Sequence, residues 1–302
     1  MVEFKPTLVK TEVLDLIKRI NMKKKLFLIL GAVLFTATSF AQSFEGVVKY
    51  NRVNDPSKMY ANNPNAARMT AQFGNMAEQM RRPVIFELFV KNDEAVFKAD
   101  PKQEAGENTL QINGERRTFP RRLPKDEIYY NLATKKFKKY EEYAQQPFQL
   151  SGEIETIRWK VDPMQTRQVL GYECMMATAT EKEKRTIPVP NEAGQITMKD
   201  TIMVNEITAW FTDAIPTAAG PEKYSGLPGL VLALDVNNGV TTFVATNIEK
   251  KAVTEEELKI NSKGKKVTPE QLQKVKDDHM AEMRKNFRGG GGGPVVIMGG
   301  RG

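Results

Sequence analysis

The stretch that decides the fold is LVLALDVNNGVTTFVATNI, residues 230–248. Two runs rich in apolar residues, 230–237 and 240–248, flank the dipeptide Asn238-Gly239. This dipeptide favours a hairpin turn, because both central positions of the tight turn need positive φ, which Asn and Gly adopt readily. The stretch therefore predicts two adjacent antiparallel strands.

Further segments with strand-like alternation occur along most of the chain. They are 44–52, 84–90, 95–98, 128–132, 137–143, 158–161, 172–180, 196–204 and 206–212. Most of these segments are joined by short loops, which favours antiparallel pairing. Two polar segments, 100–125 and 181–194, interrupt the pattern and are expected to be long insertions. The sequence predicts a mainly β protein with about nine or ten strands, a curved antiparallel sheet or open barrel.

One helix is expected in the N-terminal half, over residues 64–81. Asn63-Pro64 supplies an N-cap and an N1 proline, and Met69, Phe73 and Met76 recur at helical spacing. A Met-rich stripe of this kind is typical of a helix that covers a core, and it also fits an adaptable lid over an apolar ligand.

A second helix is expected near the C-terminus, against the concave side or the edge of the sheet. Thr268-Pro269-Glu270-Gln271 supplies an N-cap, an N1 proline and a capping box. The stripe that follows is Leu272, Val275, His279, Met283 and Phe287. The glycine run 289–293 ends the helix, and residues 289–302 are expected to be a flexible tail that ends in the short apolar segment PVVIM.

The chain carries an export signal that begins at Met22. A basic group at 23–25 precedes the uncharged apolar run 26–35, and Ser39 and Ala41 occupy the −3 and −1 positions of a cleavage site before Gln42. The uncharged run is shorter than the roughly 20 residues that span a bilayer. Residues 1–21 are interpreted as a mis-assigned extension, the alternative being a genuine one with its own role.

This signal predicts a periplasmic or envelope-associated protein with no transmembrane segment after cleavage. The domain organisation expected is a signal peptide at 22–41, a single β-rich domain at 42–288 and the tail. The formal charge of the chain is +8, and the first 41 residues hold seven Lys/Arg and three Asp/Glu, which leaves +4 for the exported part. An exported protein rarely meets nucleic acid, so no nucleic-acid partner is expected.

The scarcity of Cys and His limits the chemistry. The chain has one cysteine, Cys174, and one histidine, His279. A zinc site needs three or four Cys, His or carboxylate ligands, and a Cys or Ser nucleophile needs a positioned base. We therefore expect no catalytic residue, metal or cofactor, and a structural role for the Cys174 thiol. The carboxylate pairs Glu141/Glu142 and Glu153/Glu155 leave a hydrolase open.

The segment GPEKYSGLPGLVL, residues 220–232, contains two corners. One is Gly220-Pro221, and the other is Pro228-Gly229, which fits a type II turn with positive φ on Gly229. The segment is either a stiff corner that leads into an apolar strand or a binding loop.

The same segment carries a family resemblance. GLPGLV at 226–231 stands with Trp159, the tetrapeptide GYEC at 171–174, AWFT at 209–212, Ile215-Pro216 and Gly220-Pro221. As a set, over residues 44–248, these resemble the GLPGLI family of exported bacterial proteins, with Val231 in place of the final Ile. The resemblance implies export and a β-rich fold, and it implies no reaction.

The function expected is that of an exported, non-catalytic envelope protein, which holds an apolar ligand in its curved sheet. An alternative is an accessory subunit of an outer-membrane complex that acts through sheet-edge or tail contacts, and a carboxylate-based hydrolase is a third possibility. The candidate ligand- or partner-binding residues are Gly220, Pro221, Gly226, Leu227, Pro228, Gly229, Leu230, Trp210, Met69, Phe73 and Met76.

Overall fold

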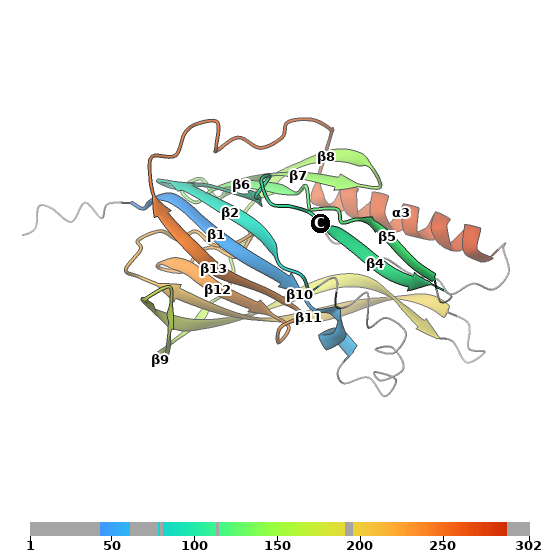
Figure 1. The fold of residues 1–302 in the computed structure, drawn as a ribbon, viewed down its shortest axis with the longest axis horizontal. Coiled ribbons are helices and arrows are strands. Elements are labelled where there is room, and N and C mark those ends of the chain that lie inside the picture. The colour runs from blue at the N-terminus through green and yellow to red at the C-terminus, as the bar shows by residue number, and fades with distance from the viewer. Residues whose placement is uncertain (1–42, 61–77, 79–80, 113–114, 191–195, 289–302) are drawn as a thin grey trace, which may run out of the picture. The chain divides into compact units, whose positions relative to one another are not determined.

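The computed structural model describes residues 43–60, 78, 81–112, 115–190 and 196–288 (Figure 1). The export signal with Ala41 and Gln42, the extension 1–21 and the tail 289–302 lie outside the described residues. So does most of the expected helix 64–81, including Met69, Phe73 and Met76. The described residues belong to one compact unit that begins at Ser43.

Twelve of the described strands form one sheet, in the order β14-β8-β7-β6-β3-β2-β1-β13-β12-β11-β10-β9. Their bounds are β1 Glu45–Asn54, β2 Val84–Lys91, β3 Glu94–Ala99, β6 Glu127–Asn131, β7 Lys136–Tyr143, β8 Gln146–Glu153, β9 Lys160–Val169, β10 Tyr172–Pro190, β11 Ile196–Thr212, β12 Leu230–Val236, β13 Thr241–Lys250 and β14 Lys265–Val267. All neighbours pair antiparallel except β14, which lies parallel to β8. Over the described residues, the sheet has two edge strands, β9 and β14, and does not close into a barrel. The prediction of a mainly β protein with an open, curved sheet is therefore confirmed.

The hairpin predicted from 230–248 is present. β12 and β13 pair from Val236 opposite Thr241 to Ala233 opposite Val244. The turn uses three residues with positive φ: Asn237 at 56°, Asn238 at 52° and Gly239 at 89°. The loop is longer than the two-residue turn expected, because Asn237 and Val240 also belong to it.

Both expected insertions contain strands, so that part of the prediction is wrong. β10 and β11 remain paired to their far end, where Pro190 lies opposite Ile196. Within 100–125, strands β4 (Glu107–Ile112) and β5 (Glu115–Pro120) form a separate two-stranded sheet. Polar residues dominate 100–109 and 181–186, and the alternation test finds no apolar period there.

The main core lies on the inner face of the bent sheet. Figure 1 shows β6–β8 and β10–β11 on opposite sides of the view, with β1 and β13 between them. Phe97 of β3 stacks on Phe86 of β2 with ring centroids 4.8 Å apart, and it meets Phe243 of β13 edge-on at 6.0 Å. The buried Tyr50 hydroxyl donates to the carbonyl of Val231 at 2.6 Å, which ties β1 to the start of β12.

A smaller core lies on another part of the sheet. Val47, Phe89 and Val96 of β1, β2 and β3 pack with Val253 and Leu258, which follow β13. These three strands are therefore covered by apolar side chains outside the main core as well.

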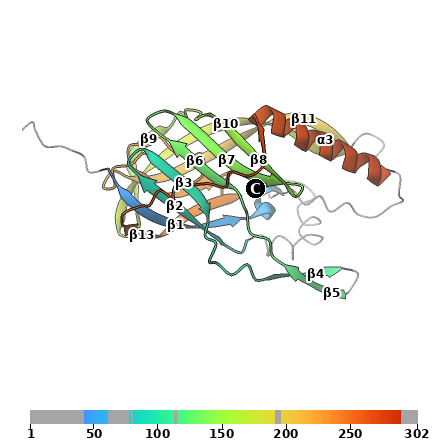
Figure 2. The same cartoon turned by 90° about the horizontal axis from the view of Figure 1, so that it is seen from above.

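The one α-helix whose bounds the structure gives is α3, Pro269–Arg288. The predicted capping box is confirmed: the Gln271 amide donates to Thr268 Oγ1 at 3.2 Å, and the Thr268 amide donates to Gln271 Oε1 at 2.9 Å. Leu272 packs on Phe148 and Leu150 of β8, which places the helix against that strand (Figure 2). Within the described residues, no helix combines the length and apolarity needed to cross a membrane.

Candidate functional site

The GLPGLV segment forms a buried corner. Leu227 and Leu230 are almost completely buried, and Gly220, Pro221 and Gly229 are buried as well, whereas Gly226 and Pro228 are exposed. Leu227 and Leu230 belong to the main core cluster. Five of these seven candidate binding residues are thus packed inside the protein, and this burial favours the stiff-corner interpretation of the motif.

The glycines of this corner are required for two different reasons. Positive φ falls on Gly226, at 92°, and not on Gly229, so the predicted type II turn at Pro228-Gly229 is wrong. Gly229 is instead needed for close approach, because a Cβ there would lie 2.2 Å from the carbonyl oxygen of Thr212. At Gly220 a Cβ would lie 2.0 Å from the carbonyl oxygen of Tyr224.

A tyrosine fixes the corner to the opposite part of the sheet. The hydroxyl of Tyr130, on β6, donates to the Gly220 carbonyl at 2.7 Å and accepts from the Gly220 amide at 3.1 Å. Burial raises the pKa of Tyr130, so this hydroxyl keeps its proton at physiological pH. The corner therefore holds one position relative to β6, and the residues that follow Gly220 are placed with it.

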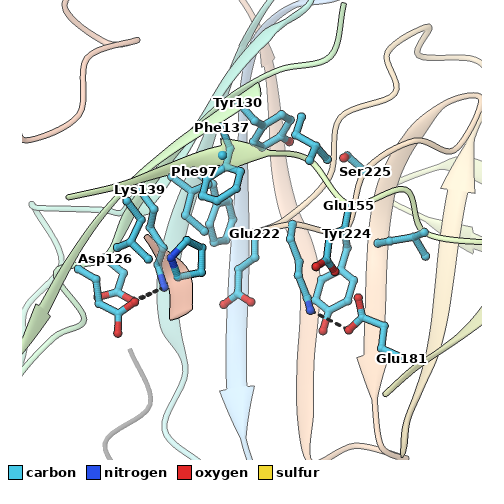
Figure 3. A pocket seen from close by; sticks show the side chains of 18 of the residues that line it. Phe97, Asp126, Tyr130, Phe137, Lys139, Glu155, Glu181, Glu222, Tyr224 and Ser225 are labelled. Atoms are coloured by element: carbon cyan, nitrogen blue, oxygen red, sulfur yellow. Dashed lines mark hydrogen bonds and ion pairs between the residues drawn. The ribbon is translucent and has the colours of Figure 1, made fainter. Parts of the chain in front are cut away.

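Those following residues form one wall of a pocket of about 810 Å³. Glu222, Lys223, Tyr224 and Ser225 line it from the corner, and Thr268, Pro269, Glu270 and Lys276 line it from the start of α3. Figure 3 shows Asp126 and Lys139 on one side, Glu155, Tyr224 and Glu181 on the other, and Glu222 between them. The volume lies within the range typical of small-molecule sites.

Aromatic rings contribute much of the apolar lining of the pocket. They are Phe86, Phe97, Phe137, Phe243, Tyr130 and Tyr224. Ile154 and Ile157, which are partly buried, extend this apolar lining. Burial also raises the pKa of Tyr224, with a smaller contribution from Glu222. The pocket can therefore hold an apolar body.

Arg52 places a buried positive charge in this aromatic lining. Its guanidinium lies between two rings, with Cζ 5.6 Å from the centroid of Phe86 and 5.7 Å from that of Phe243. Both rings attract the cation through their faces. Glu222 Oε1 lies 3.5 Å from a terminal nitrogen of Arg52. The backbone of Glu222 has a φ of 52°, unusual for a residue with a side chain, and the corner holds it there.

A second charged group lies between β6, β7 and α3. Lys139 Nζ is 3.2 Å from Asp126 Oδ2 and 2.7 Å from Glu141 Oε2, and Glu141 also pairs with Lys276 of the helix. Burial raises the pKa of Asp126. Burial also opposes the charge of Glu141, but Lys139 and Lys276 outweigh it and lower the pKa of Glu141. This cluster holds α3 at the pocket wall.

Carboxylates outnumber cationic groups around the pocket, in a chain whose formal charge is +8. Eight carboxylates line it: Asp126, Glu141, Glu153, Glu155, Glu181, Glu183, Glu222 and Glu270. Four cationic side chains line it: Arg52, Lys139, Lys223 and Lys276. Low-dielectric walls concentrate such a field, so the pocket attracts positive charge.

Several other residues singled out from the sequence lie outside the pocket lining: Cys174, Trp210, His279 and Glu142. Cys174 is fully buried, and burial raises the pKa of its thiol to about 11, which fits a structural thiol. Trp210 lies under the guanidinium of Arg167 at 4.5 Å, and His279 Nδ1 lies 3.1 Å from the Tyr143 hydroxyl. Of the two carboxylate pairs, Glu141, Glu153 and Glu155 line the pocket and Glu142 does not. Within the part of the chain that the structure describes, no group of three or more Cys, His, Asp or Glu could hold a metal ion.

Sequence reasoning missed most of the charged pocket residues, although two patterns could have indicated them. Alternation along β1 puts Arg52 on the same face as the buried Val48 and Tyr50. Alternation along β7 likewise puts Lys139 and Glu141 on the face of Phe137. A charged residue at a strand position that otherwise carries buried apolar side chains is expected to be ion-paired or functional.

Comparisons with known proteins give a family match and distant structural neighbours. A family model described as "Protein of unknown function (Porph_ging)" matches residues 159–233. No curated protein sequence matches the chain. Two solved structures, PNGF-II in space groups P21 and C2, are similar with a TM-score of 0.45 each, at 12% and 13% identity over 77% of this chain. The chain spans about a third of the length of those proteins, 33% and 32%.

Proposed function

We propose that this protein is an exported, envelope-associated binding protein of the GLPGLI type, which holds a small ligand with an apolar body in its pocket and performs no reaction on it. The observation that carries the proposal is the pocket of about 810 Å³ lined by six aromatic rings. Small-molecule sites usually have this size and an apolar, aromatic part of the wall that holds the body of the ligand, and the charged side chains here surround such a part.

The surroundings of the pocket support a rigid binding site. Its corner wall is fixed by the two hydrogen bonds between Tyr130 and Gly220, and its helix wall by the ion pair between Lys276 and Glu141. A pocket whose walls are fixed before binding loses less conformational entropy when the ligand enters.

The binding test is titration of the purified protein with N-phenyl-1-naphthylamine, a neutral apolar dye whose fluorescence rises when it leaves water. We expect saturable binding, and Ile154→Gln should weaken it about fivefold, because roughly 1 kcal/mol of apolar contact is lost. Ile202→Gln is the matched control, since Ile202 is 66% exposed and does not line the pocket. Failure of the wild type to bind the dye, or equal binding by Ile154→Gln, would refute the proposal.

The export part of the proposal has its own test. Cell fractionation followed by N-terminal sequencing should recover the protein from the envelope or periplasm with Gln42 as its first residue. Recovery from the cytoplasm with residues 22–41 still attached would contradict it.

A further inference from the structure

Buried polar atoms without a hydrogen bond are concentrated in the pocket. In the described residues, four buried side-chain atoms lack a hydrogen-bond partner: Arg52 Nε, Asn108 Oδ1, Asp126 Oδ2 and Glu181 Oε2. All but Asn108 line the same pocket. Because buried polar groups in folded proteins are nearly always hydrogen-bonded, three such atoms around one cavity indicate that a ligand supplies their partners.

Arg52 requires an acceptor. Its Nε–H is buried, the residue is only 6% exposed, and the contact of its guanidinium with Glu222 is a long one at 3.5 Å. The planar guanidinium presents its donors as a fork that matches an anionic oxygen group, which Glu222 does not engage at hydrogen-bond distance. An oxygen of the ligand that reaches Arg52 would complete this set.

The carboxylates require donors. Asp126 Oδ2 lies 3.2 Å from Lys139 Nζ, and Glu181 Oε2 lies 2.8 Å from Lys223 Nζ, so each oxygen has one ion-pair partner but accepts no hydrogen bond. The carboxylates around the pocket also exceed the cationic groups, eight to four. A positively charged donor on the ligand would supply a hydrogen bond to these oxygens, and the surrounding carboxylates favour its charge.

We propose that the pocket binds a zwitterion on an apolar body, with an anionic oxygen of the ligand at Arg52 and a primary ammonium group among the carboxylates on the Glu181 side. This inference rests on the proposed binding function and names the ligand chemistry. Two sources offer that chemistry in a cell envelope: a short hydrophobic peptide with free termini and a lipid with a phosphoethanolamine head.

The test is displacement of N-phenyl-1-naphthylamine by matched compounds. The peptide arm compares Leu-Phe, N-acetyl-Leu-Phe and Leu-Phe methyl ester. The lipid arm compares dihexanoyl phosphatidylethanolamine with its N-acetyl derivative. Removal of the ammonium or of the anionic oxygen should weaken displacement about tenfold, since each change removes a charge-assisted hydrogen bond. Displacement of the dye by unmodified Leu-Phe indicates a peptide ligand, and displacement by unmodified dihexanoyl phosphatidylethanolamine indicates a lipid ligand.

Variants assign the two ends of the ligand. Glu181→Gln should weaken the parent zwitterion about tenfold and leave its N-acetyl form unchanged. Glu255→Gln is the matched control, because Glu255 is exposed and does not line the pocket. Arg52→Lys should weaken the zwitterion and leave the methyl ester unchanged. If the buried Arg52 variant does not fold, Glu181→Gln and the compound series still decide the question.

The two proposals fail separately. If the dye binds but no parent zwitterion displaces it better than its blocked forms, the ligand chemistry proposed here is overturned and the apolar pocket stands. Unchanged displacement in Glu181→Gln would also overturn it. If the dye does not bind at all, both proposals fall.

Discussion

Gly229→Ala is the sharpest perturbation of the fold. The new Cβ would lie 2.2 Å from the carbonyl oxygen, 2.6 Å from the carbonyl carbon of Thr212 and 2.9 Å from the amide nitrogen of Asp213. All three are main-chain atoms, so no side chain can rotate away to make room. Leu227, two residues before Gly229, and Leu230, directly after it, are buried at 1% and 0% exposure, so the segment cannot move toward solvent without exposing them.

The magnitude follows from this geometry. An ordinary contact of about 3.4 Å requires a main-chain shift of roughly 1 Å, in a place where Leu230 pairs with Thr212 at the end of β11. Overpacking of this kind destabilises by about 3 kcal/mol. For a domain of this size, that free energy corresponds to a fall in Tm of roughly 6 to 12 °C.

The assay is thermal unfolding followed by circular dichroism, with denaturant unfolding to obtain the free energy. Gly106→Ala is the control, because its Cβ meets nothing within 4 Å although its φ is +66°. That backbone conformation alone costs about 1 kcal/mol. If Gly229→Ala unfolds at or above the temperature of Gly106→Ala, close main-chain approach is not the reason for glycine at 229.

Three further changes test other contacts of the fold. Tyr130→Phe leaves the Gly220 amide and carbonyl without their partner, so the free energy of unfolding should fall by about 1 to 3 kcal/mol in denaturant titrations. A fall no larger than that caused by Tyr→Phe at an exposed position would show that these two hydrogen bonds do not stabilise the corner. The pKa of Glu257 is lowered to about 2, first by the Lys251 ammonium and then by the Thr254 amide. The stability that ionised Glu257 contributes is therefore fully present above pH 4.5 and is lost as the pH falls toward 2. Glu257→Gln should flatten that part of the Tm-against-pH curve, and an unchanged slope would count against the contact. Thr268→Ala removes the helix cap and should cost about 1 kcal/mol, read as faster amide hydrogen exchange in the first turns of α3; equal exchange would disprove the cap.

The secondary-structure elements that are determined by neighbouring residues were predictable from the sequence. The β12–β13 hairpin follows from Asn238-Gly239 between two apolar runs, and the start of α3 follows from Thr268, Pro269 and Gln271. In each case the interacting groups lie within a few residues of one another, so propensity and spacing carry the information.

The strands formed mostly by polar residues were not predictable in this way. The second half of β10 and the β4–β5 pair consist mostly of polar residues and are held by main-chain pairing with their neighbours, whereas segment 196–204 of β11 was predicted as a strand. The role of Gly229 was also not predictable, because its close approach to Thr212 is a contact between residues distant in sequence and produces no local sequence pattern. A positive φ, by contrast, has a known preference for glycine.

By itself, the sequence determined that strands dominate, where the main hairpin turns and where the last helix begins, because hydrophobic period and turn chemistry act over a few residues. Only the tertiary structure decided the pocket. Arg52 meets Glu222, and Tyr130 meets Gly220, across long intervals of chain, since β1 lies between β2 and β13 and the sheet bends around the corner. Which distant charges face one cavity depends on strand order and curvature, and those are properties of the whole sheet.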